Sequence, residues 1–418
     1  MGTRKKKAEA LPAAEVQTNQ YADTKVERLN NIKYIDNDIN KGIKINWKEV
    51  FECYKKLGCP KTVYDPTELP IEKAAWFVLT SERSTGKTTN LILIAMILAL
   101  KYGCVSAYIR QMPKDISPKE MQNFLSVITA NHYVEKLTGG EYNGVRYWAR
   151  YYRFVKWGED GSKEKESEPF LWVGCLAEEL NYKSILNLPT CQMIIYDEFI
   201  TDMYLPNEFV SLNNLHKTIG RKRKEIKLFL CSNTINYYHE YFKELLIQDE
   251  VLDCKINESF IKKTELGTCV YYKWIGDKDP EREELNTEYY GFNNPLLRSI
   301  TGGDWAVRGY PHIIREDREV LDDKHFITYL GRYFQIELVT SERLGLHIIA
   351  HKANEPEAKR QCFIYTIDEI RDKREKYCYG KTKLDKLIWN LYNDNKWYYS
   401  NNDIGFSVQS YVNRADKL

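Results

Sequence analysis

Short apolar segments alternate with polar turns through most of the chain. Apolar residues between Trp47 and Leu57 recur at helical spacing, which predicts a helix within 46–58. Continuous apolar runs predict buried strands at 75–79, 105–109 and 191–197, and a longer run predicts a buried helix over 87–100. Alternation of buried strands with helices indicates an α/β fold with a mainly parallel sheet between helices.

A basic and aromatic segment at 146–157, a charged turn at 158–168 and an apolar run at 170–174 predict a β-hairpin with a polar tip. Aromatic rings between arginines are suited to nucleic-acid binding. They are equally suited to a twisted hairpin whose arginines extend into water along one face, and this second interpretation is the preferred one.

Further along, helical spacing predicts a helix over 206–219, and apolar runs predict strands at 226–230 and 269–275. The polar residues 276–320 resemble a connector, because they contain several turn-forming pairs. The remaining residues predict a small α+β domain. Its expected strands are 326–330, 333–339, 346–350 and 361–365, and its expected helices are 368–376 and 382–392.

Composition narrows the class of protein. A chain of 418 residues is long enough for two or three domains, and a net charge of +2 gives no sign of a strongly charged partner. The ten cysteines have no C-x-x-C pair, which argues against zinc and disulfide frameworks and favours a reducing cytoplasm. The sequence shows no secretory signal, and its longest apolar run is too short for a bilayer. Residues 1–45 are polar and open with a basic cluster, so we expect a disordered tail, with a tail that contacts nucleic acid as the alternative.

The turn after the first predicted strand carries the strongest candidate chemistry. It fits the phosphate-binding loop G-x-x-x-x-G-K-[ST], with Ser81 in place of the first glycine. Backbone N–H groups of such a loop surround the phosphates, while Lys87 reaches the β- and γ-phosphates and Thr88 binds Mg²⁺. The strand before it and the helix after it are the expected context. The predicted ATP-binding residues are Ser81, Glu82, Arg83, Ser84, Thr85, Gly86, Lys87 and Thr88.

A second pattern, an apolar strand that ends in Asp197 and Glu198, is typical of a Walker B motif. Asp197 would hold Mg²⁺ at the carboxyl end of the sheet, and Glu198 would orient and deprotonate the attacking water. Glutamate directly after the aspartate favours a hydrolase with an additional strand between the two motifs over a small-molecule kinase.

Polar residues after the Walker B strand extend the candidate site. Asn233 ends a predicted strand and is placed like a polar sensor of the γ-phosphate or of water. The basic run 220–224 has two interpretations: a solvated helix end, or an arginine finger that reaches the γ-phosphate of a neighbouring subunit. The sequence does not choose between Arg221 and Arg223.

Four motifs together resemble those of viral DNA-packaging ATPases. They are Ser-x-Arg-x-x-Gly-Lys-Thr, Ile-Ile-Tyr-Asp-Glu-Phe-Ile, Gly-Arg-Lys-Arg and a strand ending in Ser-Asn. The resemblance is strongest to the DNA encapsidation proteins of small podovirus-type phages with protein-primed genomes, relatives of the terminase large subunits. It covers about residues 70–245. Arg83 is its most distinctive residue, because packaging ATPases commonly carry arginine at this position of the loop.

The resemblance implies an ATP- and Mg²⁺-dependent motor that moves double-stranded DNA into a procapsid. The expected partners are double-stranded DNA and the portal of the procapsid, and a structural RNA is a further candidate. Copies of the chain are expected to form a ring, with a pentamer as the expected form. The expected location is the host cytoplasm, on the procapsid, with no membrane contact. Glu198, Arg83, Arg221 and Arg223 are the implied catalytic residues, and Thr88 and Asp197 the implied metal ligands.

The implied architecture is an ASCE-type P-loop ATPase domain followed by an RNase H-like domain. The expected divisions are 1–45 (tail), 46–280 (ATPase), 281–320 (connector) and 321–418 (nuclease-like). The strand expected at 326–330 carries no carboxylate, so we expect no nuclease activity. Two other classes remain open: another P-loop enzyme, such as a helicase, a repair ATPase or a small-molecule kinase, and a non-enzymatic nucleotide-binding scaffold.

Overall fold

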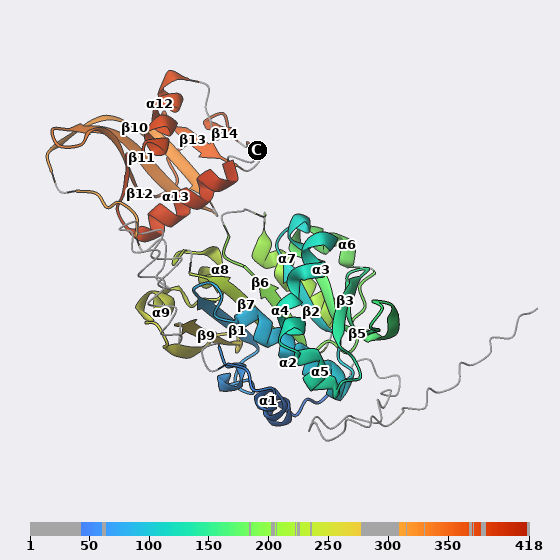
Figure 1. Cartoon of the computed structure of the whole chain (residues 1–418). Helices are drawn as coiled ribbons and strands as arrows, with labels where there is room; N and C mark the ends of the chain where they lie inside the picture. Colours follow the sequence, from blue (N-terminus) through green and yellow to red (C-terminus); the bar gives the residue numbers. More distant parts are fainter. Residues whose placement is uncertain are drawn as a thin grey trace, which may run out of the picture. The chain divides into compact units, whose positions relative to one another are not determined.

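The computed structural model contains two β-sheets, and its elements are labelled in Figure 1. It describes residues 43–60, 64–183, 185–201, 205, 207–221, 223, 226–234, 236–276, 309–314, 316–329, 331–367, 370, 372–377 and 382–415. Most of the predicted tail and most of the predicted connector lie outside these residues.

The first sheet has nine strands in the order β3-β4-β5-β2-β6-β7-β1-β9-β8. β2 runs parallel to β5 and β6, and β1 runs parallel to β9, while β3–β4–β5 and β8–β9 are antiparallel. The strands are β1 (Trp76–Ser81), β2 (Ser106–Arg110), β3 (Gly144–Trp148), β4 (Tyr151–Trp157), β5 (Lys163–Cys175), β6 (Met193–Asp197), β7 (Lys227–Asn233), β8 (Ser259–Lys263) and β9 (Cys269–Ile275).

Helices connect these strands, as expected for an α/β fold. They are α1 (Trp47–Lys56), α2 (Lys87–Tyr102), α3 (Pro118–Phe124), α4 (Ser126–Ala130), α5 (Tyr133–Thr138), α6 (Glu179–Tyr182), α7 (Glu208–Gly220), α8 (Glu240–Glu244) and α9 (Gln248–Asp253), with 3-10 helices at η1 (Pro66–Glu68), η2 (Pro113–Ile116) and η3 (Leu176–Glu178).

Helix α2 is apolar on all sides, which is typical of a helix buried within a domain. Each residue from Leu91 to Leu98 is at most 2% exposed. Gly103 ends the helix in the left-handed conformation (φ 64°), and its N–H donates to the carbonyls of Ala99 and Leu98. None of the helices in the described part of the chain is long and apolar enough to cross a membrane.

The second sheet has six strands in the order β14-β13-β10-β11-β12-β15. β10, β11 and β12 form an antiparallel meander, whereas β13 is parallel to β10, β14 to β13 and β15 to β12. The elements are β10 (Arg318–Tyr329), β11 (Arg332–Ser341), β12 (Gly345–Ala353), β13 (Phe363–Thr366), β14 (Glu375–Tyr377), β15 (Trp397–Tyr399), α12 (Lys383–Asn393) and α13 (Asn402–Ala415).

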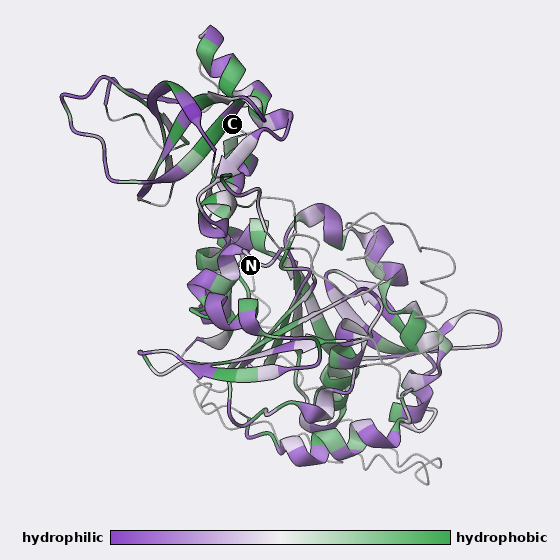
Figure 2. Ribbon diagram, turned by 90° about the vertical axis from the view of Figure 1, so that its left-hand side faces the viewer, coloured by the Kyte–Doolittle hydropathy of each residue, from purple (hydrophilic) through white to green (hydrophobic). Residues whose placement is uncertain are grey.

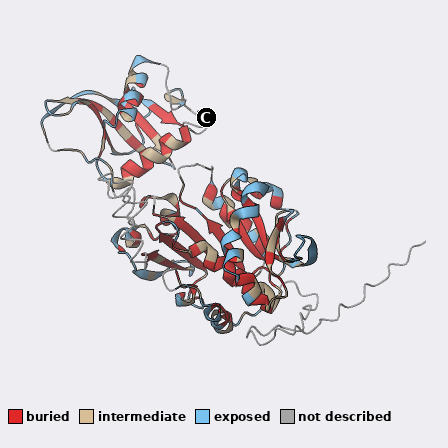
Figure 3. Cartoon of the chain, viewed as in Figure 1, coloured by how far each residue is buried: buried red, intermediate tan, exposed pale blue. Residues whose placement is uncertain are grey.

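Helices α12 and α13 complete the core of this second sheet. Trp389 of α12 and Tyr411 of α13 are buried in one cluster with Ile327, Phe334 and Ile348 of the strands. Figure 3 shows the strands of both sheets as mostly buried, and Figure 2 shows hydrophobic residues concentrated on strands, with hydrophilic residues on the loops around them.

By contact density the chain divides into two compact units. Among the described residues, one comprises those within 43–71, 86–196 and 214–228, and the other comprises those within 72–85, 197–213 and 229–415.

The predicted strands and helices are largely confirmed, with three corrections. Residues 146–157 form two strands rather than one, because Ala149 and Arg150 both adopt left-handed φ (49° and 67°) and reverse the chain. Residues 163–168, expected in a turn, belong to β5. The helix expected at 368–376 is wrong: Asp372–Arg374 form a bend and turn, and Glu375–Tyr377 form β14.

Candidate active site

The predicted phosphate loop follows β1, whose six residues are all buried. The Ser81 hydroxyl lies 2.7 Å from the Thr85 hydroxyl oxygen and donates to the Glu82 carbonyl oxygen at 2.5 Å. Ser81, Glu82 and Thr85 are each at most 4% exposed. A serine in place of the first glycine is therefore accommodated, because its hydroxyl closes the loop on itself.

The backbone of the loop takes two left-handed turns, at Ser84 (φ 63°) and at Gly86 (φ 81°). Gly86 is the N-cap of α2 and has no side chain to cover the first turn of the helix. The positive end of the helix dipole therefore faces the loop, as in anion-binding sites at helix N-termini. Lys87 is buried at 7% exposure, whereas Arg83 and Ser84 are exposed.

The Walker B pattern ends the buried strand β6. Asp197 is its last residue and is 8% exposed. Glu198 follows it, is exposed, and has a left-handed φ of 55°. This conformation is costly for a residue other than glycine, by about 1–3 kcal/mol, and such strain clusters at functional sites.

Strand β7 joins the end of β6 to the end of β1. The N–H of Phe199 donates to the carbonyl of Cys231 (3.3 Å), and the N–H of Thr234 donates to the carbonyl of Ser81 (3.0 Å). Asn233, the predicted sensor, is the last residue of β7 and is half-buried. The structure thus brings the start of the phosphate loop, the Walker B carboxylates and Asn233 to one edge of the sheet.

Two supporting groups at this edge were not singled out by the sequence. The Ser232 hydroxyl accepts a hydrogen bond from the N–H of Ile200 (3.2 Å) and donates to its carbonyl (3.4 Å), so it ties the residues after Glu198 to β7. Phe199 is fully buried, with its ring 5.2 Å from that of Tyr241. The sequence signal for Ser232 was its position directly before Asn233, at the end of a predicted strand.

The two candidate arginines of the basic run have different surroundings. Arg221 follows the last residue of α7, is exposed, and has a left-handed φ of 41°. Its Nη2 donates to the Leu186 carbonyl at 3.3 Å. Arg223 instead donates hydrogen bonds to main-chain carbonyls of two segments, the loop before β6 and the end of α7.

The donor set expected for Mg²⁺ consists of the Thr88 hydroxyl and the Asp197 carboxylate. Both are hard oxygen donors, which Mg²⁺ prefers, and in nucleotide sites this ion usually takes one or two protein ligands together with phosphates and water. Within the described ranges, no group of three or more His, Cys, Asp and Glu side chains is placed to hold a metal ion. Thr88 and Asp197 are thus oxygen donors of the kind that Mg²⁺ takes beside a nucleotide.

No protein-family model matches the sequence, and no curated protein matches it. The structure is similar to that of the Phi-28 gp11 DNA packaging motor, with 20% sequence identity and a TM-score of 0.54 over 86% of this chain and 99% of that chain. It is also similar to the bacteriophage Phi-29 viral genome packaging motor assembly, with 16% identity and a TM-score of 0.53 over 85% of this chain and 100% of that chain. This chain therefore has the fold of these two phage DNA-packaging motor proteins, which here comprises a nine-stranded and a six-stranded sheet.

Proposed function

We propose that this chain is a subunit of a viral DNA-packaging motor that hydrolyses ATP to translocate double-stranded DNA into a procapsid. The observation that carries this proposal is the edge of the first sheet. There, hydrogen bonds through β7 bring Ser81 of the phosphate loop, the residues after Glu198 and Asn233 together. The fold shared with two packaging-motor proteins over nearly their whole length supports the same assignment.

Each residue of the edge has a distinct task in the proposed reaction. Backbone N–H groups of the loop and Lys87 would bind the phosphates, and Thr88 and Asp197 would hold Mg²⁺, which neutralises phosphate charge when bound. Glu198 would orient the water and accept its proton, and Asn233 would contact the γ-phosphate or that water. Arg83, exposed on the loop, would stabilise charge in the transition state.

The assembly follows from the same proposal. The chain would form a homo-oligomeric ring, with a pentamer as the expected form, docked on the portal of a procapsid in the host cytoplasm. Double-stranded DNA would pass through the ring, and a structural RNA is a further candidate partner. DNA contacts would be made largely to phosphates, so the affinity for DNA should fall steeply with salt.

For the second sheet we propose an RNase H-like domain without nuclease activity, within the boundaries 321–418. An antiparallel meander of three strands, extended by parallel strands beside its first strand, supports the RNase H-like topology. Asp322 and Asp323 of β10 lie beside His325 (3.4 Å) and Arg360 (3.0 Å), respectively. Carboxylates engaged in this way are poorly suited to share a pair of metal ions.

The test is the rate of ATP hydrolysis by the purified protein without DNA, with single-stranded DNA and with double-stranded DNA. We expect double strands to raise turnover most. Glu198→Gln should lower the stimulated rate by about 10²–10⁴-fold, because it removes the general base. Glu159→Gln, at an exposed glutamate of the β4–β5 turn, is the matched control and should retain the wild-type rate.

Stimulation mainly by single strands would favour a helicase or repair ATPase instead. Full turnover in Glu198→Gln would contradict the assignment of the base. ATP binding without turnover under all three conditions would favour a nucleotide-binding scaffold.

A further inference from the structure

Arg223 uses its whole hydrogen-bonding capacity on the main chain. Nη1 donates to the carbonyls of Pro189 (2.7 Å) and Cys191 (2.7 Å), and Nη2 donates to those of Leu188 (2.8 Å) and Ile219 (2.6 Å). Nε donates to the Gly220 carbonyl at 3.2 Å. A guanidinium has five N–H donors, so these five bonds leave none for a phosphate.

These bonds connect two segments that are about 30 residues apart in the sequence. Ile219 and Gly220 end α7, where the last carbonyls of a helix have no partner within the helix. Leu188, Pro189 and Cys191 form the loop that leads into β6, the strand that ends at Asp197. Arg223 therefore fixes the end of α7 to the start of the Walker B strand.

Lysine could not replace this arginine. An ammonium group has three donors and lacks the planar fork that reaches carbonyls on two sides. Burial also lowers the pKa of Arg223, so the protein holds this charge away from water at a cost and compensates it with carbonyl dipoles. A side chain of this kind is suited to holding the backbone in place rather than to moving toward a ligand.

Arg221 lies between Gly220, the last residue of α7, and Arg223, and its side chain is bound far less tightly. It is exposed, and its contact within the described residues uses one of its five donors, at 3.3 Å. Its φ of 41° is the left-handed conformation that usually requires glycine after a helix. An arginine at such a position needs support from its surroundings, and the bonds of Arg223 to the carbonyls of Ile219 and Gly220, directly before Arg221, supply it.

We propose that Arg223 is a positioning residue that holds Arg221 outward, and that Arg221 is the arginine finger acting on ATP bound to a neighbouring subunit. This inference rests on the proposed motor function. It assigns different roles to two arginines that the sequence does not distinguish.

The test compares Arg221→Ala, Arg223→Lys and Arg343→Lys, the last being a matched control at an exposed arginine of the β11–β12 turn. Alone, Arg221→Ala should reduce DNA-stimulated turnover by about 10³-fold or more. Arg223→Lys should reduce it by about 10²-fold, because the finger is displaced rather than removed. Arg343→Lys should keep the wild-type rate.

Mixed rings separate positioning from general damage. Glu198→Gln subunits cannot hydrolyse ATP but still present Arg221. In a ring mixed at random and one to one with Arg221→Ala subunits, about a quarter of the sites combine an intact Glu198 with a neighbour's Arg221. Turnover should therefore return to about a quarter of the wild-type rate. Arg223→Lys subunits should be rescued in the same way, since their own nucleotide sites are intact. No rescue of either variant would overturn the trans-acting role.

A second measurement does not depend on ATP turnover. Hydrogen exchange of the backbone should become faster at 186–191 and at the end of α7 in Arg223→Lys, and should stay as in the wild type in Arg221→Ala. Unchanged exchange in Arg223→Lys would overturn the positioning role even if the motor function holds. Faster exchange in a protein whose wild type shows no DNA-stimulated turnover would instead refute the motor function alone.

Discussion

Left-handed backbone at residues other than glycine occurs in three of the segments that carry candidate chemistry. Ser84 lies in the phosphate loop, Glu198 follows the Walker B strand, and Arg221 follows α7, with φ of 63°, 55° and 41°. Each costs about 1–3 kcal/mol and persists only where the surroundings determine it. For Glu198 the Ser232–Ile200 hydrogen bonds supply that support, and for Arg221 the bonds of Arg223 to the carbonyls at the end of α7 do.

His239 makes the surroundings of the Walker B segment sensitive to acid. Its Nδ1 accepts a hydrogen bond from the N–H of Tyr241 (3.4 Å), and its ring lies 5.9 Å from that of Phe199. Burial lowers its pKa to about 3. The neutral ring is therefore required in the folded state, whereas the unfolded chain takes up a proton below its ordinary pKa of about 6.5.

We predict that the stability of α8 falls as the pH is lowered from 7 to 5. The unfolded state binds the extra proton in this range, so up to about 2 kcal/mol is lost at pH 5. Hydrogen exchange of peptides that cover Glu240–Glu244, corrected for the intrinsic pH dependence, measures this loss. His239→Asn retains a capping acceptor but does not titrate, and it should flatten the dependence. An equal loss in this variant would exclude His239 as the cause.

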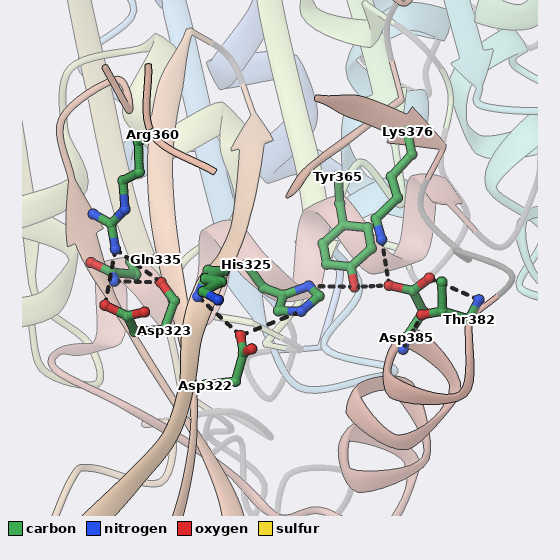
Figure 4. A network of polar contacts seen from close by, with 10 residues as sticks. Asp322, Asp323, His325, Gln335, Arg360, Tyr365, Lys376, Thr382 and Asp385 are labelled. Carbon is green, nitrogen blue, oxygen red and sulfur yellow. Dashed lines mark hydrogen bonds and ion pairs between the residues drawn. The ribbon is translucent and has the colours of Figure 1, made fainter. Parts of the chain in front are cut away.

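At the scale of elements, a buried polar network joins four elements of the second sheet (Figure 4). The Tyr365 hydroxyl of β13 donates to Asp385 of α12 (2.6 Å) and lies 2.9 Å from Nδ1 of His325 of β10. Lys376 of β14 donates to the same Asp385 oxygen at 2.5 Å. Burial opposes the charge of Asp385, but hydrogen bonds from Lys376, Tyr365 and Thr382 outweigh it and lower its pKa to about 2.

Tyr365→Phe should therefore weaken the contact between β13 and α12. It removes a hydrogen bond to a buried carboxylate, which is worth about 1.5–3 kcal/mol. Hydrogen exchange of peptides that cover Phe363–Thr366 and Lys383–Asn393 should become faster. Tyr377→Phe, at an exposed tyrosine of β14, is the matched control and should have no effect. Unchanged exchange in Tyr365→Phe would show that the network does not stabilise these elements.

At the scale of the molecule, the chain has the fold of packaging-motor proteins at only 20% and 16% identity. Burial patterns and strand order persist at such identity because they depend on apolar periodicity, which many sequences satisfy. The proposed phosphate loop is different, because Gly86, Lys87 and Thr88 would each meet a specific requirement of phosphate binding. Binding of a nucleotide should therefore depend on this loop and should stabilise the folded state.

ATP with Mg²⁺ should raise the unfolding temperature of the wild-type chain. A ligand at 100 times its dissociation constant stabilises the folded state by about 2.7 kcal/mol. Differential scanning fluorimetry measures the shift. Chelation of Mg²⁺ should reduce it, and Lys87→Ala should abolish it. Lys55→Ala, at an exposed lysine of α1, should keep the full shift. A full shift in Lys87→Ala would mean that the nucleotide binds elsewhere.

The sequence by itself determined the features that depend on neighbours along the chain. The phosphate loop from Ser81 to Thr88, the strand that ends at Asp197 and the apolar helix α2 are local patterns, and β9 has the predicted bounds. Local chemistry specifies such segments because the strand, turn and helix that form them are consecutive.

Only the tertiary structure distinguished the surroundings of residues that look alike in the sequence. The difference between Arg221 and Arg223 depends on carbonyls about 30 residues earlier in the chain, and the contribution of Ser232 depends on Ile200. The division of 146–157 at Ala149 depends on the pairing of β3 with β4, and the strand at 375–377 depends on the pairing of β14 with β13. Propensity and spacing describe a residue's neighbours in sequence, whereas hydrogen-bond partners and burial are set by the neighbours that folding brings to it.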